Sequence, residues 1–413
     1  MIQNRSVKLA LAALSFGFVI NDHAFCATPK LVRSPLSFDI STRKKTKIVV
    51  NDYLSLSGSV SASYLNEQNL KLDDQKNDYS NQYKTILEVV GRARLSESIT
   101  AFAHLEFSFK GKDTHIRTYD IMSDVRIKEA FFAYRFTNNT TVSLGRLRLS
   151  DKNKWIADKA VDGIHFSRRL QDSGFEIAIV KDDDRNDSTY TLAHYTRFQK
   201  KHTIGVYAIA ERSKPTNLGH LVGYINNQKN DRFTYTANVA GILGNGIVGE
   251  KNGFGFDFRA THKITQHALN PQITFGFAMG SKGFRQTGLQ SNKTKDGGQT
   301  LCNRYGFVYQ PDLTNLAVAS IGLALRPNRK FSVDLNTYFY GQVSKQVTTP
   351  SARLSGSTTG NSSFLGTEVS LIGAWRPTKK MKVEFGAGVF QAGSAYQNKT
   401  ATKRFYIRAT RYF

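Results

Sequence analysis

Residues 85–95 read TILEVVGRARL, and apolar and charged side chains alternate along most of this stretch. The apolar positions share one parity and the charged positions the other: Leu87, Val89, Ala93 and Leu95 against Glu88, Arg92 and Arg94. Because successive side chains of a β-strand point to opposite faces, the pattern predicts a strand whose two faces meet different solvents.

Similar alternation recurs along the chain, at 99–109, 254–261, 330–340, 382–390 and 404–413. Short turn-forming clusters between such segments alternate with long polar stretches, of which 283–313 and 343–363 are two. Short periplasmic turns that alternate with long extracellular loops along an even number of strands are typical of an outer-membrane barrel. We therefore predict an all-β fold, a transmembrane antiparallel β-barrel of about 18 strands, with 16 also compatible.

The two ends of the chain fit a secreted precursor. Residues 1–27 combine Arg5 and Lys8 with the apolar run LALAALSFGFVI and small residues after it, which is the pattern of a signal peptide. We expect 28–45 to form a periplasmic N-terminal lead-in and 46–413 to form a single barrel domain. Phe413 closes an amphipathic strand, which resembles the signal read by the bacterial barrel-assembly machinery, so we expect the bacterial outer membrane as the location.

The composition points to an anionic partner, because the formal net charge is +25 at pH 7. For a secreted chain we expect lipopolysaccharide, an acidic polysaccharide or small anions in this role, and no nucleic acid. After removal of the signal peptide only Cys302 is sure to remain, and no HExxH, P-loop or Ser/His/Asp arrangement occurs. We therefore expect no cofactor, no metal site and no enzymatic activity.

The stretch GRLRLSDKNKWIADKAVDGIHFSRR at 145–169 brings arginines and leucines into alternation. In a membrane barrel, an arginine that faces lipid at mid-bilayer costs about 2–4 kcal/mol, whereas one that faces the lumen costs little. We therefore expect Arg146 and Arg148 to face the lumen, with Leu147 and Leu149 toward lipid. On the returning strand the polar residues are expected inside and the apolar ones outside: His165, Ser167 and Arg169 against Ile164 and Phe166.

Three segments, KEAFFAYRF (128–136), GRLRLSDKNKWIAD (145–158) and VDGIHFSRR (161–169), resemble the central segment of the alginate export porin family. The matching positions are Glu129, Gly145, Arg146, Arg148, Trp155, Asp158, Asp162 and Gly163. The resemblance implies an eighteen-stranded monomeric barrel that passes an anionic polysaccharide through an arginine-lined constriction. Two positions depart from the family pattern, because His165 replaces an arginine and Ile156 a tryptophan. A neutral histidine dominates above a pH of about 6.5, which lowers the fixed charge and leaves open whether the polymer is alginate.

We expect the lumen and the substrate path to be lined by Arg92, Arg94, Glu129, Arg146, Arg148, His165, Arg169, Asp257, Arg259 and Arg408. A guanidinium fork accepts a carboxylate bidentately, and inward acids keep each anion site weak enough for release. For any single arginine, an ion pair that only fills the lumen is an equally good interpretation. We expect Arg404 near the periplasmic end of the last strand, against phosphates or headgroups.

Three functions remain open on these observations. The first is a porin for an anionic polysaccharide or oligosaccharide. The second is a general anion-selective porin for small solutes, and the third is a structural or adhesive surface barrel with a plugged lumen. The long stretches at 283–313 and 343–363 either fold in as a lid or are disordered, and their composition fits both.

Overall fold

The computed structural model of this chain describes residues 48–73, 78–114, 120–137, 139–183, 188–213, 216–227, 232–246, 252–264, 266–295, 297–347 and 352–413. The segments predicted as signal peptide (1–27) and periplasmic lead-in (28–45) lie outside the described residues. Nowhere in the described ranges does a helix reach the length and apolarity needed to cross a membrane.

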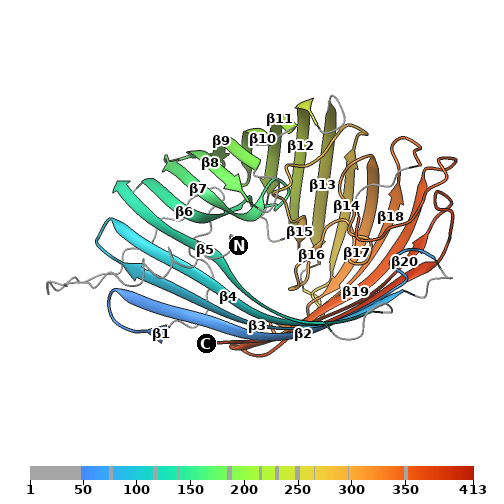
Figure 1. Ribbon diagram of the computed structural model, residues 1–413, viewed down its shortest axis with the longest axis horizontal. Helices are drawn as coiled ribbons and strands as arrows, with labels where there is room; N and C mark the ends of the chain where they lie inside the picture. Colours follow the sequence, from blue (N-terminus) through green and yellow to red (C-terminus); the bar gives the residue numbers. More distant parts are fainter. Residues whose placement is uncertain are drawn as a thin grey trace.

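Eighteen strands close into one antiparallel barrel, which confirms the predicted fold (Figure 1). Each barrel strand pairs with the next along the chain, and the last closes the barrel on the first. The barrel strands are β2 (Leu54–Gln68), β3 (Tyr79–Arg94), β4 (Ile99–Thr114), β5 (Asp120–Thr137), β6 (Thr140–Ser150), β7 (Asp158–Arg169), β8 (Ser173–Asp182), β9 (Ser188–Phe198), β10 (Thr203–Ser213), β11 (Thr216–Asn227), β12 (Phe233–Asn245), β13 (Gly253–Lys263), β14 (Gln272–Gly280), β17 (Leu316–Leu325), β18 (Phe331–Gly341), β19 (Phe364–Thr378), β20 (Met381–Ala392) and β21 (Ala401–Tyr412). Three short strands complete the order: β1 (Ile48–Val49) beside β2, and the hairpin of β15 (Lys293–Thr294) and β16 (Cys302–Asn303).

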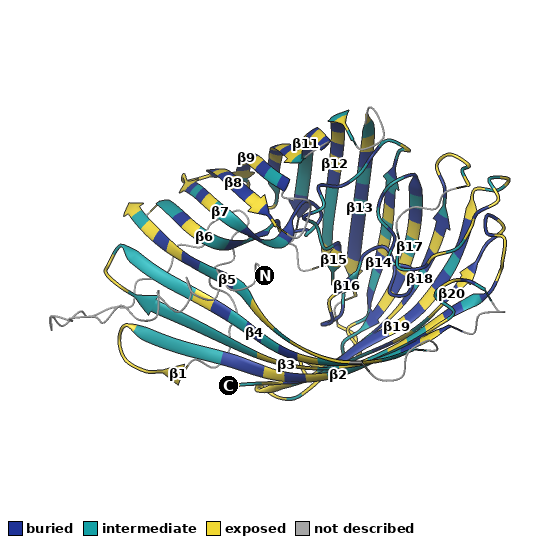
Figure 2. Ribbon diagram, viewed as in Figure 1, coloured by how far each residue is buried: buried dark blue, intermediate teal, exposed yellow. Residues whose placement is uncertain are grey.

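The outer surface is apolar because one parity of the strands carries large, exposed apolar side chains. Figure 2 shows exposed residues alternating with buried ones along many of the strands. On β21, Phe405 and Ile407 are 42% and 41% exposed, as the alternation predicted. The opposite face holds Arg408, the residue after Ile407, which reaches Ser61 of β2 inside the barrel. The barrel therefore presents lipid-compatible side chains outside and polar groups inside.

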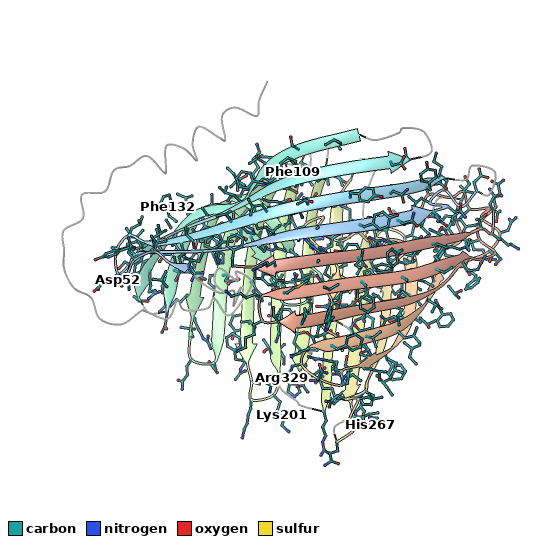
Figure 3. All side chains as sticks on the ribbon, turned by 90° about the horizontal axis from the view of Figure 1, so that it is seen from below. Asp52, Phe109, Phe132, Lys201, His267 and Arg329 are labelled. Carbon is teal, nitrogen blue, oxygen red and sulfur yellow. The ribbon has the colours of Figure 1, made fainter. Side chains whose placement is uncertain are left out.

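Short turns join strands at the periplasmic end. In the β3–β4 turn, Ser96 Oγ accepts hydrogen bonds from the backbone N–H groups of Ser98 and Ile99 at 3.2 and 3.0 Å. Such side-chain acceptors satisfy backbone donors that a tight turn leaves without a strand partner. In Figure 3, residues of this end and of the outer face are labelled: Asp52, Lys201, His267 and Arg329 at the former, Phe109 and Phe132 on the latter.

The connection between β14 and β17, residues 281–315, folds into the barrel, and we call it the interior loop. Near the extracellular end, the Glu368 carboxylate of β19 accepts the N–H groups of Phe307, Val308 and Tyr309 at 2.5, 3.0 and 2.9 Å. At the opposite end, Gln299 Nε2 of the same loop donates to the carbonyl of Arg329 in the β17–β18 turn. The described part of this loop is therefore ordered against the inner wall along its length, so of the two alternatives for 283–313 disorder is wrong.

The second long connection, between β18 and β19, contacts the opposite side of the barrel mouth. Arg353 Nε and Nη2 donate to Oε1 and Oε2 of Glu67 on β2, each at 2.5 Å. The backbone N–H of Arg353 donates to the carbonyl of Tyr309 in the interior loop, and that of Ser355 donates to the carbonyl of Leu70. The described residues of 342–363 thus join β2 to the interior loop.

Candidate functional site

The structure reverses the orientation predicted for the GRLRL stretch of β6. Leu147 and Leu149 are 0% and 2% exposed and belong to the interior hydrophobic cluster that contains Trp155. Arg146 shares the other face of the strand with Leu144, which is 59% exposed on the outer surface. The expectation that Leu147 and Leu149 face lipid is therefore wrong, because this hairpin buries its leucines inside the barrel, and Arg146 lies on the face opposite to the predicted one.

Arg148 holds the tip of the β6–β7 hairpin through Asp158, whose side chain is fully buried. Arg148 Nη2 lies 2.7 Å from Asp158 Oδ1, while Lys154 Nζ and Ser291 Oγ lie 2.9 and 2.6 Å from Oδ2. Ser291 belongs to the interior loop, so this ion-pair cluster connects the hairpin to that loop.

His165 is buried on the inner side of the barrel, in a polar cluster that links neighbouring strands. His165 Nε2 lies 3.5 Å from Glu176 Oε1, and the other oxygen of Glu176 lies 3.6 Å from His194 Nδ1. Glu129 belongs to a similar carboxylate–histidine cluster, in which its Oε1 lies 3.5 Å from Nδ1 of His104. These contacts join β7 to β9 and β4 to β5, so they brace the wall.

Arg94 and Arg169 both lie at the short-turn end of the barrel. Arg94 Nη2 donates to the backbone carbonyl of Asp52 at 3.1 Å. The Arg169 guanidinium lies 5.4 Å from the centre of the Phe198 ring, within the range of a cation–π contact. Both side chains are positioned at the periplasmic rim.

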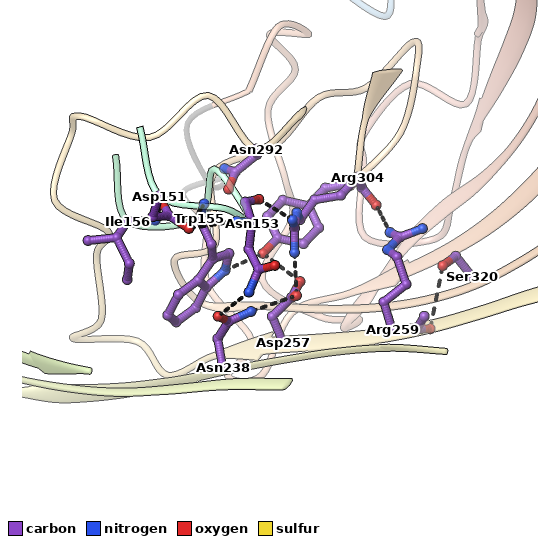
Figure 4. Close-up of polar contacts among 12 residues, drawn as sticks. Asp151, Asn153, Trp155, Ile156, Asn238, Asp257, Arg259, Asn292, Arg304 and Ser320 are labelled. Atoms are coloured by element: carbon purple, nitrogen blue, oxygen red, sulfur yellow. Dashed lines mark hydrogen bonds and ion pairs between the residues drawn. The ribbon is translucent and has the colours of Figure 1, made fainter. Parts of the chain in front are cut away.

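Asp257 and Arg259 of β13 face the interior, where they hold the interior loop (Figure 4). Arg304 Nη1 lies 2.5 Å from Asp257 Oδ1, and Tyr305 donates its hydroxyl to Oδ2 at 3.0 Å. Arg259 Nη2 donates to the carbonyl of Arg304 at 2.8 Å, and Trp155 Nε1 donates to the Tyr305 hydroxyl at 2.7 Å. The partners of Asp257 and Arg259 thus come from the interior loop, more than 40 residues further along the chain.

Arg92 and Arg408 flank β2 on the inner wall, one on β3 and the other on β21. Both are half-buried, and Arg408 Nη2 donates to Ser61 Oγ at 3.4 Å. Between them the inner face of β2 carries small hydroxyl side chains, and Ser59 Oγ donates to Glu88 at 2.9 Å. We call this part of the wall, formed by β21, β2 and β3, the serine–arginine strip.

Cations that the sequence pattern did not single out gather at the short-turn end of the interior. Lys295 of the interior loop stays exposed to solvent. Desolvation lowers the pKa of Lys295, the positive charges of Lys382, Arg376 and Arg326 lower it further, and Glu384 raises it. We call these five residues the periplasmic charge cluster. They come from four chain segments, so no local motif marks them.

Arg404 also lies elsewhere than predicted, because β21 starts at the extracellular mouth. Its Nε lies 3.3 Å from the Glu67 carboxylate, which also binds Arg353. Its guanidinium lies 4.6 Å from the centre of the Phe307 ring. The expectation of a periplasmic headgroup contact is therefore wrong, since Arg404 fixes the interior loop near the mouth.

Comparison with known proteins agrees with this architecture. The family model described as Alginate export matches residues 52–409. OpdH (OccK5) of Pseudomonas aeruginosa has a TM-score of 0.61 at 7% identity, over 88% of this chain and 99% of that chain. OccAB4 of Acinetobacter baumannii has a TM-score of 0.60 at 10% identity, over 90% and 99%. The outer membrane protein OprD of P. aeruginosa has a TM-score of 0.59 at 9% identity, over 90% and 96%. Among curated proteins none matches.

Proposed function

Because this chain belongs to the alginate export family, we propose that it passes an anionic polysaccharide or oligosaccharide through a cationic lumen. The family and the porin-like barrel support an outer-membrane porin, and they favour a channel over an enzyme. The eighteen strands close within one chain, so a monomer contains a complete lumen. The finer proposal concerns which groups form the path.

The periplasmic charge cluster is the observation that carries the proposal. After desolvation, the largest influences on the pKa of Lys295 come from three other cations, while one carboxylate, that of Glu384, opposes them. Such a local surplus of positive charge raises the concentration of anions at a channel entrance. A polyuronate has one carboxylate on each sugar, so several of its groups would meet these side chains in succession.

The serine–arginine strip would continue the path inside the barrel. The guanidinium groups of Arg92 and Arg408 can each donate two parallel hydrogen bonds to a carboxylate. The hydroxyls of Ser59 and Ser61 suit the hydroxyl groups of a sugar. Glu88, at 2.9 Å from Ser59, opposes tight binding, and transport requires weak sites from which the anion is released.

The interior loop would narrow the lumen and so determine which shape of solute can pass. Its contacts with β13, β18 and β19 place a second layer of chain inside the wall. A lumen narrowed in this way favours an extended polymer, which passes one sugar after another, over a compact solute.

The test is conductance of the mature barrel in planar lipid bilayers under a salt gradient. We expect a reversal potential that indicates anion preference, and concentration-dependent block by oligomeric polyuronate. Lys295→Glu should reduce both, whereas Lys201→Glu, in the exposed β9–β10 turn, serves as the matched charge control. Cation preference of the unaltered barrel would refute the proposal.

The same recording separates the two alternatives. Anion conductance that polyuronate does not block would favour a general porin for small anions. Absence of conductance would favour a structural barrel whose lumen the interior loop closes, an outcome that the tight contacts of this loop make worth testing.

A further inference from the structure

The seam between β5 and β6 is the least complete in the described barrel wall. Only seven residue pairs are in register across it, from Ala130↔Arg146 to Thr137↔Thr140, whereas β4 and β5 share fourteen. Within the described strands, the first half of β5 (120–129) thus has no register partner in β6, and β6 beyond Arg146 pairs only with β7. Figure 1 shows β5 and β6 side by side at one end and diverging from there.

Two local features explain where the strands part. In β5, Lys128 is an extra residue between the positions that pair with His104 and Leu105. Such a bulge bends and twists its strand. In β6, Gly145 has a φ of 130°, and a Cβ added there would lie 2.3 Å from the carbonyl oxygen of Ala130. The pairing therefore ends beside a bulge and a position that only glycine fits.

Cations from three chain segments meet at the open part of the seam. Desolvation lowers the pKa of Lys293 in the interior loop, Asp158 raises it, and Lys154, Arg148 and Lys128 lower it further. The Lys293 side chain nevertheless stays exposed to solvent. Lys128 belongs to β5, Arg148 to β6 and Lys293 to the interior loop, so the seam is lined with positive charge on both sides.

Two carboxylates in this region are outnumbered by the cations around them. Each is shared by two cations: Asp158 by Arg148 and Lys154, at 2.7 and 2.9 Å, and Glu106 by Lys84 and Lys128, at 3.5 and 3.2 Å. Lys293 adds a fifth cation to these two acids. Like charges held together in this way are stabilised when an anion with several acceptor oxygens enters between them.

The outer surface changes polarity at the same seam. Phe109 of β4 and Ile121 and Val125 of β5 are 61%, 69% and 65% exposed beside the open part. On β6 the outer face turns polar at Arg146, which pairs with Asp162 at 2.6 Å. One side of the opening therefore suits hydrocarbon and the other suits charge.

We propose that the open seam between β5 and β6 binds one outer-leaflet lipid with a phosphorylated headgroup, of the lipid A type. Its acyl chains lie along Phe109 and Val125, and its phosphate enters among Lys128, Arg148 and Lys293. A phosphate ester offers up to two negative charges and three strong acceptor oxygens, which matches a surplus of several cations better than a single carboxylate does. The ligand is a membrane component rather than cargo, so the inference does not rest on the proposed transport function.

The test is binding of diphosphorylated lipid A to the mature barrel in detergent, followed by native mass spectrometry. Lys128→Glu/Lys293→Glu is the test variant, and Lys201→Glu/Lys403→Glu, two exposed lysines away from the seam, is the matched control. A heat-dependent shift in gel mobility shows for each variant that the barrel is folded. A further variant, Val125→Ser, removes apolar surface and leaves the cations in place.

We expect the unaltered barrel and the control to retain one lipid. The test variant should bind lipid A at least about tenfold more weakly, because it loses charge-assisted hydrogen bonds to the phosphate. Val125→Ser should also weaken binding, and lipid without phosphates should bind poorly. Equal binding by the test variant, or by dephosphorylated lipid, would overturn the proposal. Competition by inorganic phosphate as strong as by lipid A would instead indicate a free-anion site and also overturn it. Anion selectivity is recorded separately, so failure of either proposal is recognised independently.

Discussion

Arg146 Nη1 lies 2.6 Å from Asp162 Oδ2 on the outer side of the barrel, two residues beyond the exposed Leu144. The side chains are 27% and 41% exposed, so the pair sits where apolar surface gives way to polar surface. An alternating Arg–Leu stretch can therefore present Arg146 at the rim of the outer face while Leu147 and Leu149 pack inside the barrel.

From this geometry we expect Arg146→Ala to leave ion selectivity unchanged. A partly exposed ion pair contributes about 1 kcal/mol or less, so the free energy of unfolding should fall only slightly. Arg92→Ala, on the serine–arginine strip, should instead reduce anion preference. Reversal potentials of both variants in the same bilayer decide the matter, and a loss of selectivity in Arg146→Ala alone would contradict the assigned orientation.

Leu147 and Val161 face each other in register across β6 and β7, and both are fully buried. We expect Leu147→Ala to lower the free energy of unfolding by about 2–5 kcal/mol, since truncation leaves a cavity in the interior cluster. Leu144→Ala, three positions away on the lipid-facing surface, is the matched control and should cost much less. Urea unfolding of barrels in vesicles measures both, and equal losses would show that Leu147 does not pack inside.

The architecture was predictable because it depends on a local period. Alternation with a period of two placed Phe405 and Ile407 outside and Arg408 inside, and the alternation of short turns and long loops indicated the strand count. A period of two does not show which face of a strand points to lipid, because leucine fits both the lipid-facing surface and a packed interior. For the GRLRL stretch, the choice was made by Trp155 and its cluster, which reach β6 only through the folded hairpin.

The contacts of the interior loop could not be predicted for a related reason. Glu368 and Tyr309 are separated by many residues, and the polar composition of 283–313 is equally compatible with disorder. What orders the loop is a set of wall residues that are individually unremarkable in sequence, such as Asp257 and Glu368. The periplasmic charge cluster has the same origin, because its members meet only after the loop has folded inward.

Glu368→Ala should loosen the interior loop, because its carboxylate accepts three backbone N–H groups and the hydroxyl of Tyr340 at 3.1 Å. Hydrogen bonds to a charged group contribute about 1.5–3 kcal/mol each, so several kcal/mol of loop anchoring are at stake. We expect larger and noisier single-channel conductance. Ser370→Ala, on the same face of β19 and equally buried, is the control that should leave the conductance steady. Unchanged conductance in Glu368→Ala would mean that the other contacts suffice to hold the loop.

The lowered pKa of Lys295 leads to a prediction about pH. An ordinary lysine has a pKa of 10.5, and desolvation together with Lys382, Arg376 and Arg326 shifts that of Lys295 downward. A lowered pKa in a lysine means that the neutral form appears at a lower pH than usual, so positive charge is lost as pH rises toward 10.5. We expect anion preference and polyuronate block to decline over this alkaline window, before ordinary lysines titrate. Lys295→Arg should keep both, because a guanidinium stays protonated there. In Lys201→Arg, the same exchange at an exposed turn, anion preference should decline with pH as it does in the unaltered barrel. If the anion preference of Lys295→Arg declined in parallel with that of Lys201→Arg, the titrating group would lie elsewhere and Lys295 would not belong to the anion path.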